Sequence, residues 1–416
     1  MAKSSTYQAP RGTFDVLPAD ARARQRIDAV AGAIFARAGY EPIATPVFED
    51  TELFERGVGR STDIVRKEMF TFEDKGGRSI TLRPEGTAPI CRAYLEHGMQ
   101  KLAPPVKLSY TGPFFRHERP QAGRYRQFHQ IGVEAIGTDS PLADAEAIML
   151  LADLLAELGV PGVELRLGSL GSPQSRNAYL DELKAHLRSH EAELSDDVRE
   201  RIEINPLRAF DADDEGTRAA MTNAPTIVER LDGEDAEHFA EVRALLEAAG
   251  VPFEIDPTLV RGLDYYTRTI FSFVCDRLGA QSEVGGGGRY DGLFEQLGGP
   301  ATPAVGWAAG IERILLALGE TDEATGRDAF LAVADPGQRR RALVLASELR
   351  HAGLTAEIDL AGRGLKSQLK HADRIGARRV LILEADGSAQ LRDMQSGEQR
   401  PVDPAGLVEA IGGERR

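Results

Sequence analysis

Two stretches of this chain carry arginines, tyrosines and carboxylates at spacings that suit a charged ligand. The first runs from Phe115 to Phe128 with the sequence FRHERPQAGRYRQF, in which four arginines and one histidine lie close together. A planar guanidinium group binds a phosphate through two parallel hydrogen bonds. We therefore predict a basic loop between two strands that binds a polyphosphate. A hairpin with a solvated tip is the alternative.

The second stretch, residues 259–273, reads LVRGLDYYTRTIFSF. From Tyr265 onward it is rich in aromatic and β-branched residues, which predicts a strand. Alternation places Tyr266 and Arg268 on one face of this strand and Tyr265 with Thr267 on the other. Buried polar tips need hydrogen-bond partners. Taken alone, the pattern is therefore typical of an edge strand with a solvated face, and the other motifs of the chain favour a ligand site instead.

Further polar residues belong to the candidate site. In the strand that returns from the basic loop, Gln130, Gly132 and Glu134 share one face, and the glycine leaves room for a ligand against the sheet. Residues 83–87, RPEGT, end one strand and open a helix. Thr87 is the expected N-cap of that helix.

A glycine-rich run and a helix follow later in the chain. Residues 285–292, GGGGRYDG, are not a P-loop, because no Gly-Lys-Ser/Thr follows them. Taken alone, the run is a flexible turn. A helix is predicted around 308–318, and Arg313 lies off its apolar stripe, near the helix N-terminus, where a phosphate is favoured. A surface arginine is the alternative.

The elements that must position these residues are short strands and helices. After Pro18, apolar residues recur at helical spacing up to Phe35, and Gly39 ends the helix. Another helix is expected over 87–97. Extended segments are expected at 40–48, 69–73, 79–83, 106–110, 131–135, 265–274 and 282–284. Antiparallel strands that alternate with helices predict an α+β fold.

Charge and periodicity divide the chain into regions. Residues 172–256 hold 9 lysines and arginines against 21 aspartates and glutamates, a net charge of −12, and are helix-periodic, so we expect an acidic helical insertion. The core is expected to comprise 1–171 and 257–320. Residues 327–416 carry 15 basic against 13 acidic residues and form a small, separate α/β domain in this prediction. Its expected strands are 329–334, 355–359 and 379–384, its expected helices are 337–352 and 364–376, and its expected linker is 319–327.

Composition narrows the class of protein. With 416 residues and 42% hydrophobic content the chain can build more than one core. Cys91 and Cys275 are its two cysteines, without metal-ligand spacing, so no disulfide framework or zinc site is expected. No apolar run reaches about eighteen residues and no signal-peptide core opens the chain. We expect a cytoplasmic protein that does not contact membranes. The net charge of −15 argues against broad nucleic-acid binding, although local basic clusters still attract phosphate.

In their order, the motifs resemble those of class II aminoacyl-tRNA synthetases. Motifs 1, 2 and 3 of that class are similar to residues 39–48 (GYEPIATPVF), 115–134 and 306–316 (GWAAGIERILL). Within the class, the runs at 259–273 and 285–292 resemble the signature of the histidyl-tRNA synthetases, and RGTFD at 11–15 is similar to their N-terminal segment. The resemblance covers nearly the whole chain.

The resemblance implies an enzyme that joins histidine to the α-phosphate of ATP and then transfers it to the 3′ end of tRNA. Arg116 would bind the α-phosphate, Arg261 would neutralise charge developing on it, and Arg313 would hold the terminal phosphates. Glu85 and Thr87 would bind the α-ammonium group of histidine, while Glu134 and Tyr266 would bind its imidazole. The implied histidine-binding residues are Glu85, Gly86, Thr87, Gln130, Glu134, Arg261, Tyr265, Tyr266 and Tyr290. The implied ATP-binding residues are Arg116, Arg124 and Arg313.

The same resemblance implies a class II antiparallel-sheet core with a helical insertion, an anticodon-binding C-terminal domain, and a homodimer formed through motif 1. Histidine tRNA, L-histidine and ATP are the implied partners. Mg²⁺ would be carried by ATP, with no protein-bound metal and no tightly bound cofactor. One alternative is a non-catalytic regulatory relative that binds histidine or tRNA, and another is a class II synthetase for threonine, proline or glycine. The retained arginines oppose the first alternative, and the run RGLDYY at 261–266 opposes the second.

Overall fold

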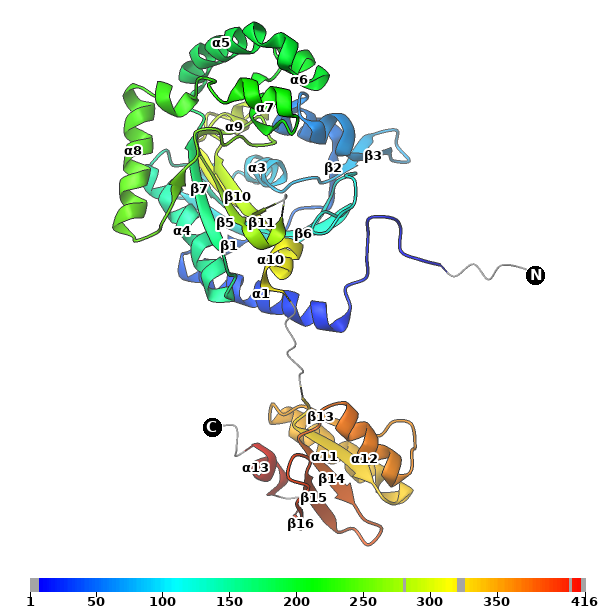
Figure 1. Ribbon diagram of the computed structural model, residues 1–416. Helices are drawn as coiled ribbons and strands as arrows, with labels where there is room; N and C mark the ends of the chain where they lie inside the picture. Colours follow the sequence, from blue (N-terminus) through cyan, green and yellow to red (C-terminus); the bar gives the residue numbers. More distant parts are fainter. Residues whose placement is uncertain (1–6, 280–281, 320–325, 404–405, 413–416) are drawn as a thin grey trace, which may run out of the picture. The chain divides into compact units, whose positions relative to one another are not determined.

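The computed structural model describes residues 7–279, 282–319, 326–403 and 406–412. The chain forms two compact units, Met1–Thr321 and Asp322–Arg416 (Figure 1). All of the candidate site residues belong to the first unit.

The first unit is built on an eight-stranded sheet with the strand order β1-β5-β6-β11-β10-β9-β7-β8. Its six central strands are antiparallel, whereas β1 and β8 lie at the edges and are parallel to their neighbours. The strands are β1 Glu41–Pro42, β5 Val106–Phe115, β6 Gln127–Ile136, β7 Val163–Ser169, β8 Glu254–Ile255, β9 Thr267–Cys275, β10 Glu283–Arg289 and β11 Ala304–Gly310. Pro42 lies on an edge strand, where its missing N–H is tolerated.

Helices cover one face of this sheet (Figure 1). They are α1 Pro18–Arg37, α4 Pro141–Leu158, α8 Gly233–Ala248 and α10 Ile311–Leu318. Their apolar sides pack on Ile131, Val133 and Trp307 in one core. The predicted helix after Pro18 is confirmed. Local sequence also fixes α4, because the Ser140 side chain accepts a hydrogen bond from an N-terminal amide and Gly159 ends the helix with φ 76°.

The opposite face of the sheet carries a second core and the polar residues of β6. Helices α3 Thr87–Glu96 and α9 Leu293–Gln296 lie on this face, and Ile90 and Tyr94 of α3 pack against Leu108 of β5. A three-stranded sheet in the order β2-β4-β3 adjoins them. Its strands are β2 Phe48–Asp50, β3 Phe70–Glu73 and β4 Ser79–Leu82, and the helix α2 spans Thr51–Phe54.

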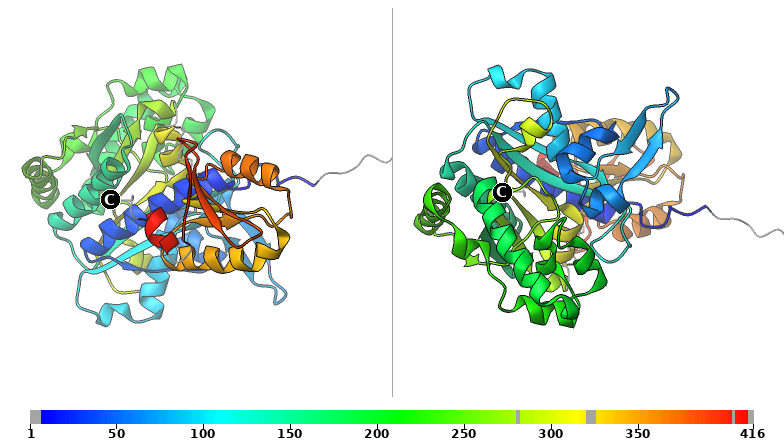
Figure 2. Two further views of the ribbon diagram at one scale, coloured as in Figure 1. Left: turned by 90° about the horizontal axis from the view of Figure 1, so that it is seen from below. Right: turned by 90° about the horizontal axis from the view of Figure 1, so that it is seen from above.

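The region 172–256 contains helices, as its periodicity predicts. These are α5 Pro173–Ser189, α6 Asp196–Arg201, α7 Glu215–Met221 and α8, with short 3-10 turns at Glu191–Glu193, Pro206–Asp211 and Ile227–Arg230. Helices α5 to α7 share an apolar cluster that includes Tyr179, Leu183 and Val198, and they gather on one side of the unit (Figure 1 and the right-hand view of Figure 2). The region also holds strand β8, which extends the large sheet.

The second unit is a five-stranded sheet in the order β13-β12-β14-β15-β16, flanked by helices. Strands β12, β13 and β14 are parallel, while β15 and β16 are antiparallel additions. The elements are β12 Ala329–Val333, α11 Arg339–His351, β13 Ala356–Ile358, α12 Leu365–Arg374, β14 Arg379–Leu383, β15 Ala389–Asp393, β16 Gln399–Pro401 and α13 Leu407–Gly412. The predicted strands and helices are confirmed here, whereas β15, β16 and α13 were not predicted. Residues 320–325 of the predicted linker lie outside the described residues.

Two differences from the sequence expectations affect the site. The run 285–288 is part of the central strand β10 and not a turn. Neighbouring backbone comes so close that a Cβ atom at Gly287 would lie 2.0 Å from the Gly306 carbonyl oxygen. The helix predicted from 308 begins only at Ile311, because residues 304–310 form strand β11.

No helix within the described ranges is both long and apolar enough to cross a membrane.

Candidate active site

A cleft opens on the sheet face that carries the polar residues of β6. It consists of two adjoining cavities of about 590 Å³ and 250 Å³. Six residues line both cavities, so the space is continuous: Arg116, Glu118, Arg124, Gln130, Glu283 and Ala308. The predicted residues Glu85, Gly86, Thr87, Arg261, Tyr265 and Tyr266 line the larger cavity, and Arg313 lines the smaller one.

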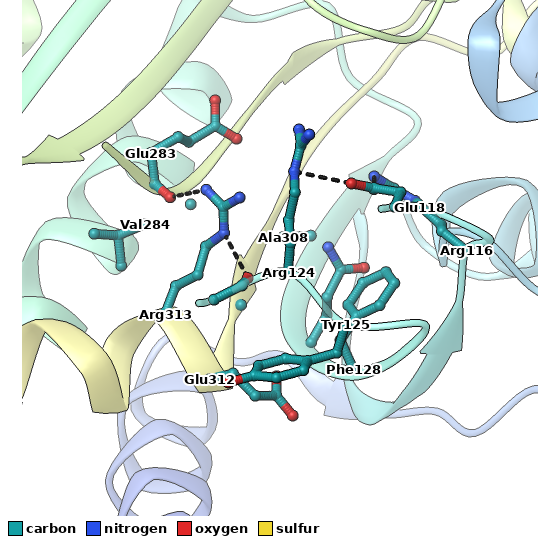
Figure 3. Close-up of a pocket in the computed structure, with 14 residues that line it drawn as sticks. Arg116, Glu118, Arg124, Tyr125, Phe128, Glu283, Val284, Ala308, Glu312 and Arg313 are labelled. Carbon is teal, nitrogen blue, oxygen red and sulfur yellow. Dashed lines mark hydrogen bonds and ion pairs between the residues drawn. The ribbon is translucent and has the colours of Figure 1, made fainter. Parts of the chain in front are cut away.

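Three arginines from two elements surround the smaller cavity (Figure 3). Arg313 of α10 donates from Nη1 to the Glu283 carbonyl oxygen at 2.6 Å and from Nε to the Gly123 carbonyl oxygen at 3.3 Å. From the β5–β6 loop, Nε of Arg124 lies 2.9 Å from the carboxylate of Glu118. Nε of Arg116 donates to the Pro84 carbonyl oxygen at 2.9 Å.

The guanidinium groups in this cavity repel one another. Burial lowers the pKa of Arg313, and the charges of Arg124 and Arg116 lower it further, although Glu283 and Glu118 act in the opposite direction. Bringing like charges together in a half-buried space costs free energy unless an anion joins them. The arrangement therefore favours a polyanion such as a chain of phosphates.

Arg261 lines the larger cavity with a carboxylate beside it. Its Nη1 forms an ion pair with Glu283, and its guanidinium carbon lies 5.8 Å from the ring centroid of Tyr266. Burial disfavours its charge, but Glu283 and Tyr266 raise the pKa of Arg261 overall. Gly286 leaves the space that Arg261 occupies, since a Cβ atom there would lie 2.9 Å from Nη1. Arg261 is therefore a fixed, permanently charged group on the cleft wall.

Buried polar atoms of several cleft residues have no hydrogen-bond partner within the described part of the chain. The side-chain oxygen Oε1 of Gln130 and the Nε of Arg261 are both buried and unpaired. Both residues line the larger cavity. An unpaired buried donor or acceptor is costly, and it is satisfied when a ligand supplies the missing hydrogen bond. The pair thus marks a place for a ligand that carries both a donor and an acceptor.

Glu134 lies beneath the cleft and does not line it. Its side chain is buried, Oε2 accepts from the Tyr290 hydroxyl at 2.6 Å, and Oε1 accepts from the Thr87 hydroxyl at 2.9 Å. Burial raises the pKa of Glu134 to about 8, although these two hydrogen bonds act to lower it. Tyr290 is likewise absent from the cavity lining. A Cβ atom at Gly306 would lie 1.7 Å from Oε2, so the carboxyl group needs a glycine beside it.

The expected N-cap role of Thr87 is wrong. Glu85 accepts the first free amides of α3, from Thr87 N at 2.7 Å and Ala88 N at 3.0 Å. This leaves the Thr87 hydroxyl free to turn inward to Glu134. The Tyr265 hydroxyl also donates to Glu85, at 3.5 Å. Glu85 thus joins the start of α3 to the tyrosines of the cleft.

The predicted alternation at the tyrosines is also wrong. Tyr265 and Tyr266 precede strand β9, both are buried, and both line the larger cavity, with ring centroids 4.7 Å apart. The space expected over Gly132 is already filled, because a Cβ atom there would lie 2.5 Å from the Tyr110 hydroxyl oxygen. The glycine accommodates a tyrosine of the neighbouring strand and not a ligand.

Several cleft residues were not predicted. Glu283 pairs with Arg261, and it stands two residues before the first glycine of the glycine-rich run, which is a signal that sequence reasoning could have used. Arg208, Asp211 and Asp213 of the acidic region also line the larger cavity. In the sequence these three residues look like ordinary solvated charges, and nothing in their spacing indicates a site.

The described part of the chain holds no group of three or more His, Cys, Asp or Glu residues that could bind a metal ion. Cys91 and Cys275 are free and buried.

Comparison of the chain with known proteins assigns it to a family. The antiparallel sheet, the arginine-lined cleft and the separate α/β unit define a class II aminoacyl-tRNA synthetase. A family model described as histidyl-tRNA synthetase matches residues 12–314, and one described as anticodon binding domain matches residues 328–414. The chain belongs to the histidyl-tRNA synthetase family.

Individual relatives span the whole chain. It is 48% identical to the histidine–tRNA ligase of Rubrobacter xylanophilus, covering 98% of this chain and 100% of the relative. It is also 48% identical to the histidine–tRNA ligase of Halothermothrix orenii, with coverages of 97% and 98%. Among solved structures, apo histidyl-tRNA synthetase of S. aureus superposes with a TM-score of 0.82 at 36% identity, covering 98% of this chain and 100% of that one.

Proposed function

We propose that this protein is an ATP-dependent ligase that charges tRNA with histidine. L-Histidine and ATP react to give histidyl-adenylate and pyrophosphate, and the histidyl group then passes to the 3′ end of the tRNA. The observation that carries the proposal is the continuity of the cleft. Arginines suited to phosphates and a pocket of carboxylates and tyrosines suited to an amino acid open into one space.

In the activation step, a carboxylate oxygen of histidine attacks the α-phosphorus of ATP and pyrophosphate leaves. No strong base is needed, because a carboxylate is already ionised at neutral pH. Arg116 binds the α-phosphate, Arg261 offsets charge that develops on it, and Arg124 and Arg313 hold the terminal phosphates. The mutual repulsion of Arg313, Arg124 and Arg116 supports this assignment. Mg²⁺ arrives bound to the phosphates of ATP.

The larger cavity recognises histidine. Glu85 and Thr87, with Gly86 between them, bind the α-ammonium group, and the unpaired Gln130 oxygen accepts a further N–H from it. Tyr265 and Tyr266 enclose the side chain of the amino acid.

The imidazole ring of histidine hydrogen-bonds Tyr266 and Glu134, and Tyr290 orients Glu134. Glu134 does not line the cavity, so its side chain must reach into it to contact the ligand, and each of its oxygens accepts one hydrogen bond and keeps a second lone pair for that contact. Because the pKa of Glu134 is about 8, its carboxyl group can donate or accept near neutral pH. A pocket of this kind discriminates strongly against amino acids that lack the matching polar groups.

We assign tRNA contacts by family membership to one loop of the first unit and to the second unit. The β5–β6 loop, residues 119–126, meets the acceptor end, and the unit of residues 327–416 reads the anticodon through hydrogen bonds to single-stranded bases. Phe330 is the single aromatic residue of that unit and is buried, so base stacking on phenylalanine, tyrosine or tryptophan has no partner there.

The chain works as a homodimer in the cytoplasm in this proposal. Support for the dimer comes from the motif 1 segment, where Val47 and Phe48 expose 39% and 51% of their surface. Exposed apolar residues beside each other favour an interface. The regulatory alternative is less well supported, because the curated relatives that match nearly the whole chain are histidine–tRNA ligases.

Replacing Arg261 tests the assignment of charge stabilisation. Arg261→Ala should lower histidine-dependent ATP–pyrophosphate exchange by about 10²-fold or more, since one preorganised donor contributes that much in a water-excluded site. Arg277→Ala is the matched control, because Arg277 is exposed and does not line the cleft. Circular dichroism should show both variants folded. Near-normal exchange in folded Arg261→Ala would contradict the role.

A further inference from the structure

Arg268 has a backbone conformation that side chains rarely adopt. Across the described ranges it is the one non-glycine residue with a positive φ, at 46°. Such a conformation is unfavourable for an L-residue and persists only where the surroundings impose it. Arg268 follows Tyr265 and Tyr266 closely in the chain, so whatever holds it also affects the cleft.

A carboxylate of the acidic region holds the Arg268 side chain. Its Nε donates to Oδ1 of Asp235, in α8, at 2.9 Å. Asp235 is only 5% exposed, and its other oxygen accepts from Ser172 N at 2.8 Å and from the Ser175 hydroxyl at 2.6 Å. Asp235 thus ties the start of α5 and the strained residue to α8.

Backbone groups on both sides of Thr267 are held by residues of α5 and of the segment directly before it. The amide of Arg268 donates to the Gly171 carbonyl oxygen at 2.8 Å. Arg176 of α5 donates from Nη2 to the carbonyl oxygen of Tyr266 and from Nε to the Leu170 carbonyl oxygen at 3.3 Å. The segment that joins the tyrosines to β9 is therefore fixed by the start of α5 as well as by α8.

This anchored segment is a bulge in the sheet. Thr267 pairs with Arg289, but the adjacent residue of β10, Gly288, pairs with Ile270, so β9 carries extra residues. A bulge interrupts the two-residue alternation of a strand and re-aims its side chains. Tyr265 and Tyr266 come directly before this bulge and outside the strand, so the path of the chain at the bulge sets where the two tyrosines are placed.

We propose that the Asp235–Arg268 ion pair positions the histidine pocket: the acidic region holds the β9 bulge, and the bulge presents Tyr265 and Tyr266 to the amino acid. Both members of the pair are positioning residues and act through the tyrosines. The inference rests on the proposed function, in which those tyrosines bind histidine. It gives the acidic region a role in amino-acid activation that is separate from contact with tRNA.

The ATP side of the cleft provides an internal reference. The arginines of the smaller cavity lie on the β5–β6 loop and on α10, which the Asp235–Arg268 pair does not touch, whereas Arg261, beside Tyr266, lines the larger cavity. Loss of the pair should therefore weaken histidine use and leave ATP use nearly unchanged.

The test measures ATP–pyrophosphate exchange by the full chain over ranges of histidine and ATP. Asp235→Asn and Arg268→Ala should raise KM for histidine about tenfold, which corresponds to about 1.4 kcal/mol, with KM for ATP within about twofold of wild type. Arg230→Ala is the matched control: it breaks the exposed Arg230–Glu182 pair of the same region and should change neither constant.

A glycine variant separates positioning from stability. Arg268→Gly removes the ion pair but allows the positive φ, so it should have a higher Tm than Arg268→Ala while its KM for histidine stays raised. Three results would overturn the inference. The first is an unchanged KM for histidine in Asp235→Asn and Arg268→Ala. The others are a KM for histidine that changes together with Tm across the two Arg268 variants, and a KM for ATP that rises by the same factor as KM for histidine.

Calorimetric titration with L-histidine alone keeps this inference distinct from the proposed function. Wild type that binds histidine without catalysing exchange would contradict the ligase function. The positioning role would then be judged by the dissociation constants. It predicts about tenfold weaker histidine binding in Asp235→Asn and Arg268→Ala than in Arg230→Ala, and equal constants in all three variants would overturn it.

Discussion

Glu134 has no positively charged partner among the groups that dominate its pKa. Burial raises that pKa to about 8, neutral hydroxyls of Tyr290 and Thr87 lower it, and the nearby Glu85 raises it again. The folded protein therefore keeps a proton on Glu134 over a range in which the unfolded chain, with its ordinary value of 4.5, has lost it. Stability from this group is fully present below the unfolded pKa and is lost as pH rises through about 8.

Replacing Glu134 by a side chain that does not titrate tests the raised pKa at the residue scale. Glu134→Gln keeps the shape of the carboxyl group and removes its titration, with an NH2 donor in place of one accepting oxygen. As pH rises from about 5 to about 8, the unfolding free energy of wild type should fall relative to that of the variant, by at most about 4 kcal/mol. Urea denaturation across this range measures it. Parallel pH profiles would contradict the raised pKa.

Residue types predicted only part of the site. The convergence of Arg116, Arg124 and Arg313 could be anticipated, because several arginines near a strand end and a helix start suit an anion. That Glu134 lies beneath the cleft, and that Thr87 turns to it, depends on burial and on Glu85 capping α3. Those facts are properties of packed neighbours and are not encoded in any local pattern.

At the scale of elements, the glycine-rich strand β10 lets its two neighbouring strands approach closely beneath the cleft. Its glycines meet the backbone of both neighbouring strands, and Gly286 leaves the space that Arg261 fills. Strands, helices and the α+β class followed from periodicity. The bulge at Arg268 and the strand character of 285–288 did not, because both arise from pairing with distant residues.

Gly287→Ala tests the close approach of these strands. The added Cβ would lie 2.0 Å from the Gly306 carbonyl oxygen, so the sheet must shift, and we expect a loss of about 1–3 kcal/mol in unfolding free energy. Gly292→Ala is the control, since nothing lies within 4 Å of the position that its added methyl group would take. Chemical denaturation of both variants provides the comparison, and equal stability of the two would refute the packing argument.

At the scale of the whole molecule, the candidate active site lies entirely within the first of the two units. The first contains the complete cleft, including contributions from the acidic region, and the second has its own cores on both faces of its sheet. The acidic charge of 172–256 could be read from the sequence. Its participation in the cleft through Arg208, Asp211 and Asp213 could not, because only the folded chain brings them to the larger cavity.

Histidine-dependent ATP–pyrophosphate exchange by the purified protein tests the central claim most directly. Threonine, proline and glycine serve as controls, because related class II enzymes activate them. We expect exchange with histidine alone, since the pocket supplies polar partners for an imidazole ring. Exchange with another amino acid would contradict the assignment of Glu134 and Tyr266, and a folded protein without any exchange would contradict the ligase function itself.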